Sequence, residues 1–310
     1  MRTLKDYLLL FAKGLAMGGA DVVPGVSGGT VAFISGIYEE LIDSIKAINL
    51  DSLKVLLRGE FKDFWSLING NFLIVLFSGI AISLKSLASL MTYLMEHNPI
   101  QLWSCFLGLI LISSIVILRQ IKKWSFGVVI AGIIGIVASY YLTSLSPAQT
   151  NDSYLMIFLS GALAICAMIL PGISGAFILL IIGKYQLVVG ALGNLDYGII
   201  AVFGAGAATG ILLFVRLISW LLNKYHNYAI ATLAGFMMGS LNKIWPWKQD
   251  LVFDINRHGE QFATVQKNIM PNQYLEITGN SPHIIHAILF MAIGFFIVVV
   301  IEKIALSLKK

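Results

Sequence analysis

Charged residues, cysteine and proline are all scarce in this chain. Only 12% of its 310 residues are Asp, Glu, Lys or Arg, whereas 58% are hydrophobic. Soluble globular domains carry about 25% charged residues, so this composition excludes that class. The apolar runs are about twenty residues long, which is the length that crosses roughly 30 Å of hydrocarbon as a helix. We therefore expect a multi-pass membrane protein.

The near absence of cysteine excludes a disulfide framework. The two cysteines, Cys105 and Cys166, lie inside apolar segments, which also argues against a metal cluster. An enzyme acting on a lipid phosphate would need a general acid, a general base or a nucleophile. The five histidines, however, lie in loops or at the ends of apolar segments, without metal-ligand spacing. We therefore predict no catalytic activity, no metal and no cofactor.

The basic residues are distributed as in a membrane protein. The formal net charge is +5, but Lys and Arg form short clusters between apolar segments, where they would face anionic lipid headgroups. Lys and Arg favour cytoplasmic loops. The N-terminus, residues 46–62, residues 119–123 and the C-terminus are basic, whereas loops 95–99 and 146–153 contain no Lys or Arg. We exclude nucleic acid as a partner and predict that both termini are cytoplasmic.

Six apolar segments have the length of full transmembrane helices. They are residues 71–95, 101–118, 125–144, 197–222, 228–247 and 283–305. Two further apolar stretches, 7–48 and 154–195, are each interrupted near the middle by Pro-Gly-x-Ser-Gly. The distribution of Lys and Arg requires each of these stretches to return to the side on which it began. We expect two re-entrant helical hairpins, with a single interfacial amphipathic helix over 49–70.

The two interruptions form an internal repeat. ADVVPGVSGGTVAFISGIY at 20–38 aligns without a gap with AMILPGISGAFILLIIGKY at 167–185. Three predicted spans separate the copies, and an odd number inverts one copy relative to the other. We therefore predict an all-α membrane protein with an inverted-topology repeat. Its parts are repeat one (1–118), a connecting span and loop (119–153), repeat two (154–247), an extracytoplasmic loop (248–282) and a last span with a cytoplasmic tail (283–310). Inverted repeats with broken helices are typical of secondary transporters.

The residues at the interruptions predict an anion site. Pro ends one helix, Gly permits a tight turn, and a Ser is placed to cap the next helix. The first N–H groups of that helix would then face an anion, phosphate above all. The candidate substrate-binding residues are Gly25, Ser27, Gly28, Gly29 and Thr30 in the first interruption and Gly172, Ser174 and Gly175 in the second.

Four charged residues extend this prediction. Arg216 and Lys85 lie within predicted spans, where a cation needs an anionic partner or access to water. They are candidate counter-charges for the bound anion, although Arg216 could instead reach the cytoplasmic interface. Asp21 is either a helix cap or the site of coupling to H⁺ or Na⁺. Glu39 is a second, weaker candidate for ion coupling.

Three stretches resemble a known family: GGADVVPGVSGGTVAFISGIYEELI, AICAMILPGISGAFILLIIGKY and ATLAGFMMGSLNKIWPW. They resemble the bacterial polyprenyl-phosphate (undecaprenyl phosphate) transporters, once catalogued as a membrane domain of unknown function, and the likeness covers nearly the whole chain. It implies a flippase of the cytoplasmic membrane that returns undecaprenyl phosphate to the inner leaflet for peptidoglycan and other cell-wall synthesis. It also implies that the residues of both interruptions, with Arg216, bind the headgroup.

The residues alone leave a second function open. An ion-coupled carrier of a small soluble anion would use the same helix N-termini and the same arginine. A lipid substrate requires an apolar lateral opening from the site to the bilayer, whereas a soluble anion requires an aqueous vestibule. The two copies also differ chemically, because Met168, Ala176 and Phe177 stand where the first copy has Asp21, Gly29 and Thr30. A coupling ion is therefore expected beside the first copy.

Overall fold

The structure, a computed structural model, describes residues 2–21, 27–145, 150–255 and 261–307. The first half of the chain forms α1 (Leu4–Asp21), α2 (Gly28–Ile34), α3 (Tyr38–Lys46), α4 (Leu50–Leu57), α5 (Phe61–Leu67), α6 (Gly70–His97), α7 (Pro99–Leu118) and α8 (Phe126–Ser144). The second half forms α9 (Tyr154–Ile169), α10 (Gly175–Ile181), α11 (Tyr185–Asn194), α12 (Tyr197–Lys224), α13 (His226–Ser240), β1 (Lys248–Ile255), β2 (Gln261–Asn268), α14 (Pro271–Thr278) and α15 (Ile284–Ser307).

The described helices of the two interrupted stretches follow in the same order. In each, a long helix is followed after the break by a helix of seven residues, α2 or α10, and then by a third helix, α3 or α11. The short helices are followed by Gly36 (φ 71°) and Gly183 (φ 68°), which occupy equivalent positions in the two copies. A positive φ suits glycine because it has no Cβ. Shared glycines therefore end the short helix in the same way in both copies.

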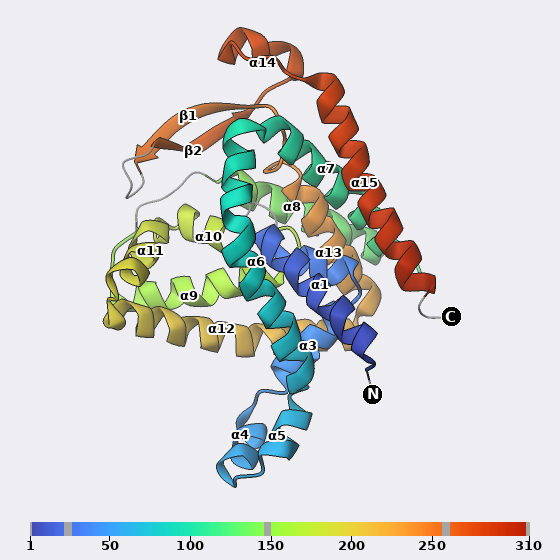
Figure 1. The fold of residues 1–310 in the computed structure, drawn as a ribbon, viewed down its shortest axis with the longest axis vertical. Helices are drawn as coiled ribbons and strands as arrows, with labels where there is room; N and C mark the ends of the chain where they lie inside the picture. The colour runs from blue at the N-terminus through green and yellow to red at the C-terminus, as the bar shows by residue number, and fades with distance from the viewer. Residues whose placement is uncertain (1, 22–26, 146–149, 256–260, 308–310) are drawn as a thin grey trace.

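The long helices pack in pairs. α1 packs with α6, α9 with α12, α8 with α13, and α7 with α15. Figure 1 shows α9 and α12 running side by side. Glycines line these contacts: Gly14 lies against the backbone of Leu76, and Gly206 lies against the carbonyl oxygen of Phe158. Small residues let helices approach closely, which favours association where lipid supplies no hydrophobic driving force.

Three of the predicted spans are long, continuous apolar helices in the part of the chain that the structure describes. Among the described residues, α7, α8 and α12 are long and apolar enough to cross a membrane. The pair α5–α6, bent by 68°, would add a fourth. The segment expected at 228–247 forms α13, which has only 15 residues, and the chain then turns. Apolar composition therefore identified the segment but not where its helix ends.

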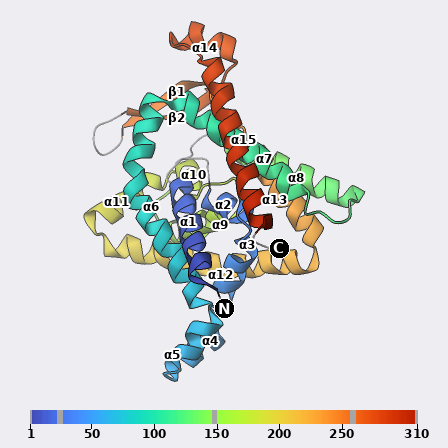
Figure 2. The ribbon, with the colours of Figure 1, turned by 45° about the vertical axis from the view of Figure 1, so that its right-hand side comes forward.

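Two segments outside the long helices differ from expectation. Residues 248–282 contain an antiparallel pair of strands, with Lys248 opposite Asn268, followed by α14, so the all-α prediction is wrong for this segment. Residues 49–70 form two helices, α4 and α5, instead of one, because the chain turns at Gly59 (φ 79°). Figures 1 and 2 both place the strands and α14 at one end of the molecule and α4 and α5 at the opposite end.

The main hydrophobic core surrounds the first short helix. Ala32 and Phe33 of α2 are buried with Ile42 of α3, Ile110 of α7 and Met237 of α13. α2 therefore lies deep in the protein, where unpaired backbone groups need polar partners from the chain or from a ligand.

Candidate functional site

The first interruption supplies its own helix cap. Ser27 has extended backbone (φ −123°, ψ 134°), and its Oγ accepts a hydrogen bond from the Gly29 amide at 3.1 Å. Asp21, the last residue of α1, accepts a 2.7 Å hydrogen bond from the Gly28 amide. The prediction that Ser27 is an N-cap is therefore confirmed, and Asp21 accepts from a second amide of the first turn. Gly25 lies outside the described residues.

The two interruptions contact one another. The Ser27 hydroxyl donates to the carbonyl oxygen of Met168 at 3.1 Å, and Thr30 Oγ1 accepts from the Gly172 amide at 2.8 Å. The side chains of Ser27 and Thr30 are fully buried. A Cβ added to Gly29 would lie 2.7 Å from the Ile169 carbonyl oxygen, so this glycine permits the close approach. Segments about 140 residues apart in sequence thus meet through polar groups.

The second interruption is less completely capped. Gly172 has φ 88°, in the region that favours glycine. Ser174 has the extended backbone of an N-cap, but its side chain makes no capping hydrogen bond. Met168 stands in the place of Asp21, and a Cβ on Gly175 would lie 2.6 Å from Met168 Cγ. Within the described segments, the first amides of α10 therefore lack the side-chain acceptors that those of α2 have.

The short helices α2 and α10 can bind an anion mainly through their free N–H groups and less through the helix dipole. α2 and α10 have seven residues each, which is about two turns. The helix macrodipole sums over aligned peptide units, so a helix this short has a weak one. The unpaired N–H groups of its first turn do not depend on length. An anion at these sites would be bound mainly by individual amides and hydroxyls.

The two cations that the sequence predicts within spans lie on the outside of the fold. Arg216 on α12 and Lys85 on α6 are both exposed. Within the described part of the chain, neither forms an ion pair. The structure does not bring them to the interruptions, so their role as headgroup ligands remains a prediction.

Glu39 lies apart from Asp21. Its carboxylate is exposed, 3.9 Å from Nδ1 of His226. It borders a small cavity of about 230 Å³ between α3 and α12, beside Asp43 and Ser219. Ser219 Oγ accepts from Lys46 Nζ at 2.8 Å and donates to Asp43 at 3.1 Å. No group of three His, Cys, Asp or Glu residues in the described segments could bind a metal ion.

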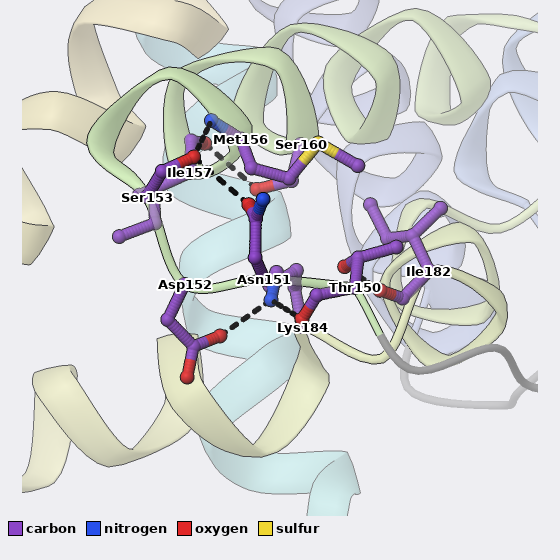
Figure 3. Close-up of polar contacts among 9 residues, drawn as sticks. All are labelled: Thr150, Asn151, Asp152, Ser153, Met156, Ile157, Ser160, Ile182 and Lys184. Carbon is purple, nitrogen blue, oxygen red and sulfur yellow. Dashed lines mark hydrogen bonds and ion pairs between the residues drawn. The ribbon is translucent and has the colours of Figure 1, made fainter.

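Lys184 is a buried charge that the sequence reasoning missed. Figure 3 shows its amino group between Asp152 and the backbone of Thr150. The ammonium donates to the Thr150 carbonyl at 2.7 Å and forms an ion pair with Asp152. Lys184 is the only charged residue in 154–195. A single charge in so apolar a stretch could have indicated that it has a buried partner. The contact ties the segment before α9 to the turn after α10.

Two more lysines went unnoticed in the sequence. Lys243 follows α13 and Lys248 begins β1, and both line a cavity of about 750 Å³. Lys243 lies inside the segment 228–247 that the sequence predicted as a span, so a cation in an apolar segment was the available signal, whereas Lys248 begins the polar loop that follows and gave none.

Comparison with known proteins identifies relatives along most of the chain. The family described as "Undecaprenyl phosphate translocase-like" matches residues 17–262. A protein of Vibrio cholerae named polyprenyl-phosphate transporter is 44% identical over 300 residues, which cover 97% of each chain. One of the same name from Staphylococcus aureus is 32% identical over 253 residues, covering 76% of this chain and 84% of the relative. No solved structure matches the chain.

Proposed function

The chain belongs to the undecaprenyl phosphate translocase-like family, and we propose that it carries undecaprenyl phosphate from the outer to the cytoplasmic leaflet of the bacterial cytoplasmic membrane. A phosphate cannot cross hydrocarbon bare, because the charge loses its hydration. The polyprenyl tail, in contrast, can remain in the lipid. The protein therefore has to shelter only the headgroup, and the meeting of two interrupted helices deep in the core is the observation that carries this proposal.

The proposed architecture is an inverted repeat with two re-entrant hairpins, 7–48 and 154–195, and cytoplasmic termini. The equivalent turns at Gly36 and Gly183 support it. The pairing of the long helices supports it as well, since α1–α6 in one half corresponds to α9–α12 in the other. The remaining helices exchange partners: α7 packs with α15, and α13 packs with α8. This exchange suggests that α8 belongs to the first repeat and α15 to the second.

The proposed headgroup site is the contact between the interruptions. Ser174, Gly175 and the Gly172 amide would donate to the phosphate from the second copy, and Ser27, Thr30 and the glycines beside them from the first. In the present conformation Ser27 and Thr30 bond to the opposite copy. A headgroup would replace these bonds, which requires the two copies to move apart. Rocking of one repeat against the other would then give alternating access.

Arg216 and Lys85 are the proposed counter-charges at the boundary with lipid. Both are exposed on apolar helices, where a cation without an anion or water is unfavourable. A lipid phosphate approaching sideways from the bilayer would supply that anion. This arrangement favours a lipid-linked phosphate over a soluble anion.

Asp21 is the proposed coupling carboxylate. Its carboxylate accepts the hydrogen bond of the Gly28 amide. Without Asp21, that amide could donate to a phosphate oxygen instead. Protonation of Asp21, or binding of Na⁺ to it, would weaken this bond and free the amide for the substrate. Ion binding and headgroup binding would then be linked. Glu39 is the second carboxylate to test, although it lies at the surface beside His226.

Reconstitution tests the function directly. Movement of undecaprenyl phosphate between the leaflets of liposomes is measured for the wild type, Arg216→Ala and Ser174→Ala, with Arg119→Ala in an exposed loop as the control. We expect at least tenfold slower movement in the first two variants and none of this loss in the control. Unchanged rates in both would remove the proposed site. Uptake of a soluble anion without lipid movement by the wild type would overturn the function.

A further inference from the structure

A second basic site lies beside the β-hairpin. The cavity of about 750 Å³ is bounded by the end of α8, the start of α7, the outer part of α10, the turn after α13 and the strands β1 and β2. Pockets for small ligands measure about 300–1,000 Å³, so it is large enough to hold more than an inorganic phosphate. Figure 1 shows the strands at the end of the molecule far from α4 and α5. The charge pattern predicts that this end, with residues 248–282, is extracytoplasmic.

Three lysines contribute positive charge to this cavity. They are Lys243, Lys248 and Lys267. The only carboxylate among the lining residues is Asp250, which accepts a 2.7 Å hydrogen bond from Gln266. In the described segments, none of the three lysines is within ion-pair distance of a carboxylate. The lining therefore has a surplus of positive charge, as an anion site requires.

Aromatic rings and backbone position two of these lysines. Lys248 Nζ lies 4.4 Å from the centre of the Trp103 ring and donates to the Lys243 carbonyl at 2.6 Å. Lys243 Nζ lies 4.7 Å from the centre of the Phe177 ring. Cation–π contacts stabilise an ammonium without neutralising it. Both amino groups are thus held in place, and among the described residues neither is paired with a carboxylate.

Burial makes Lys248 dependent on an anion for its charge. Burial, together with the neighbouring Lys243 cation and against the effect of Asp250, lowers the pKa of Lys248 to about 7. An anion close to the amino group favours its charged form. The charged form of Lys248 is therefore unfavourable in the empty cavity, and an anion bound there would stabilise it.

Apolar and aromatic side chains form part of the lining, beside polar ones such as Asn242 and Gln266. The apolar and aromatic ones include Trp103, Tyr140, Phe177, Leu180, Ile181 and Tyr274. An inorganic phosphate would gain nothing from such walls, whereas a phosphate ester with an apolar chain could bury its first carbon atoms against them. The combination of lysines and apolar walls in one cavity matches the chemistry of a prenyl phosphate.

The cavity adjoins the interruption of the second copy. Phe177 lies two residues beyond Gly175 on α10, and the Lys243 amide donates to the Ser240 carbonyl at 2.8 Å. Ser240 in turn lies against Gly172, since a Cβ added to Gly172 would be 2.9 Å from Ser240 Oγ. A headgroup leaving the cavity would need to travel only a short way to reach Gly172 and Ser174.

We propose that the cavity with Lys243 and Lys248 is the first binding site for the phosphate of the prenyl lipid on the extracytoplasmic side, before the headgroup reaches the interruptions. The inference rests on the proposed function. It adds a second phosphate site, on different residues, to the one between the hairpins. It also assigns a role to the β-hairpin, which covers the site and contributes Lys248 and Lys267.

Binding of short probes to the full-length protein in nanodiscs tests this site. The probes are a C15 prenyl phosphate, the C15 prenyl alcohol and inorganic phosphate. We expect the double variant Lys243→Gln/Lys248→Gln to lower the affinity for the prenyl phosphate at least tenfold and to leave the weak binding of the alcohol unchanged. The control Lys62→Gln removes an exposed lysine of α5 and should bind like the wild type. Lys243→Arg/Lys248→Arg keeps both charges and should retain most of the affinity.

Two binding results would overturn the inference. One is an unchanged affinity for prenyl phosphate in the double glutamine variant. The other is equal affinity of the wild type for inorganic and prenyl phosphate, which would exclude a lipid ligand. Flipping assays on the same variants separate this inference from the proposed function. If lipid movement depends on Ser174 but not on the two lysines, the cavity site is wrong and the function stands. If the wild type moves no lipid, the function itself fails.

Discussion

The Gly172 amide donates a 2.8 Å hydrogen bond to Thr30 Oγ1, joining the two interrupted helices at their centre. Thr30 is fully buried, and Gly172 follows directly on the second Pro of the repeat. A buried amide without an acceptor is costly in a protein interior and more so in a membrane. This bond therefore holds the present conformation and has to be replaced whenever the two copies separate.

Thr30→Val should destabilise this conformation. Valine keeps the shape of threonine but leaves the Gly172 amide unpaired, at a cost of about 1–3 kcal/mol. We expect a lower midpoint of thermal unfolding in detergent and slower lipid movement. Thr30→Ser keeps the acceptor and should retain most of the stability. An equal midpoint for Thr30→Val and Thr30→Ser would show that the hydrogen bond contributes nothing.

Asp21→Asn should separate transport from its driving ion. The asparagine oxygen can still accept from the Gly28 amide, so the fold is expected to persist, but the side chain can no longer bind a proton or Na⁺ by charge. Lipid movement is measured with and without an imposed H⁺ or Na⁺ gradient. The wild type should respond to one gradient and the variant to neither. If Glu39→Gln loses the response while Asp21→Asn retains it, coupling belongs to Glu39.

Lys184 and Asp152 should respond unequally to mutation. The Lys184 side chain is 1% exposed, whereas that of Asp152 is 67% exposed. In Lys184→Met the remaining carboxylate is solvated, so we expect a loss of at most about 1.5 kcal/mol. Asp152→Ala leaves a buried cation with one backbone acceptor, and the loss should be larger, toward the roughly 3–5 kcal/mol seen for broken buried pairs. Unfolding in denaturant would give the order, and the reverse order would refute this explanation.

Two glycines of α12 offer a matched test of helix packing. A Cβ on Gly206 would collide with the Phe158 carbonyl oxygen of α9, whereas one on Gly204 meets no atom within 4 Å. Gly206→Ala should therefore destabilise the protein by about 1–3 kcal/mol through overpacking. Gly204→Ala should be neutral or slightly stabilising because alanine favours helix. Thermal midpoints of the two variants measure the difference, and equal midpoints would mean that α9 and α12 adjust freely.

Lys248 predicts a specific dependence of stability on pH. Its pKa is lowered to about 7 in the fold, first by burial and then by Lys243, against about 10.4 in an unfolded chain. Between these values the unfolded chain holds a proton that the folded protein lacks, so the free energy of unfolding rises with pH in this window. Below about pH 7 Lys248 is protonated in both states, so the folded protein is destabilised by the full cost of burying the charged amino group. The wild type should therefore gain more thermal stability than Lys248→Met between pH 7 and pH 10. Parallel curves for the two proteins would contradict this assignment.

Local chemistry made parts of the structure predictable. The low charge and long apolar runs identified a membrane protein, and the motif residues placed both interruptions and the Ser27 cap. The shared glycines at 36 and 183 adopt the same positive φ in both copies. These features could be read from the sequence because each depends on a property of the residue itself: the missing amide of proline, the missing Cβ of glycine, or the oxygen of serine beside a free N–H.

Only the tertiary structure decided which of these groups meet. Nothing in the spacing places Thr30 on Gly172, Lys184 beside Asp152, or Lys243 and Lys248 in one cavity. The prediction of a single helix over 49–70 was wrong for a related reason, since the turn at Gly59 divides it into α4 and α5. Such contacts join residues far apart in sequence, and they depend on how whole helices and strands pack, which no local pattern records.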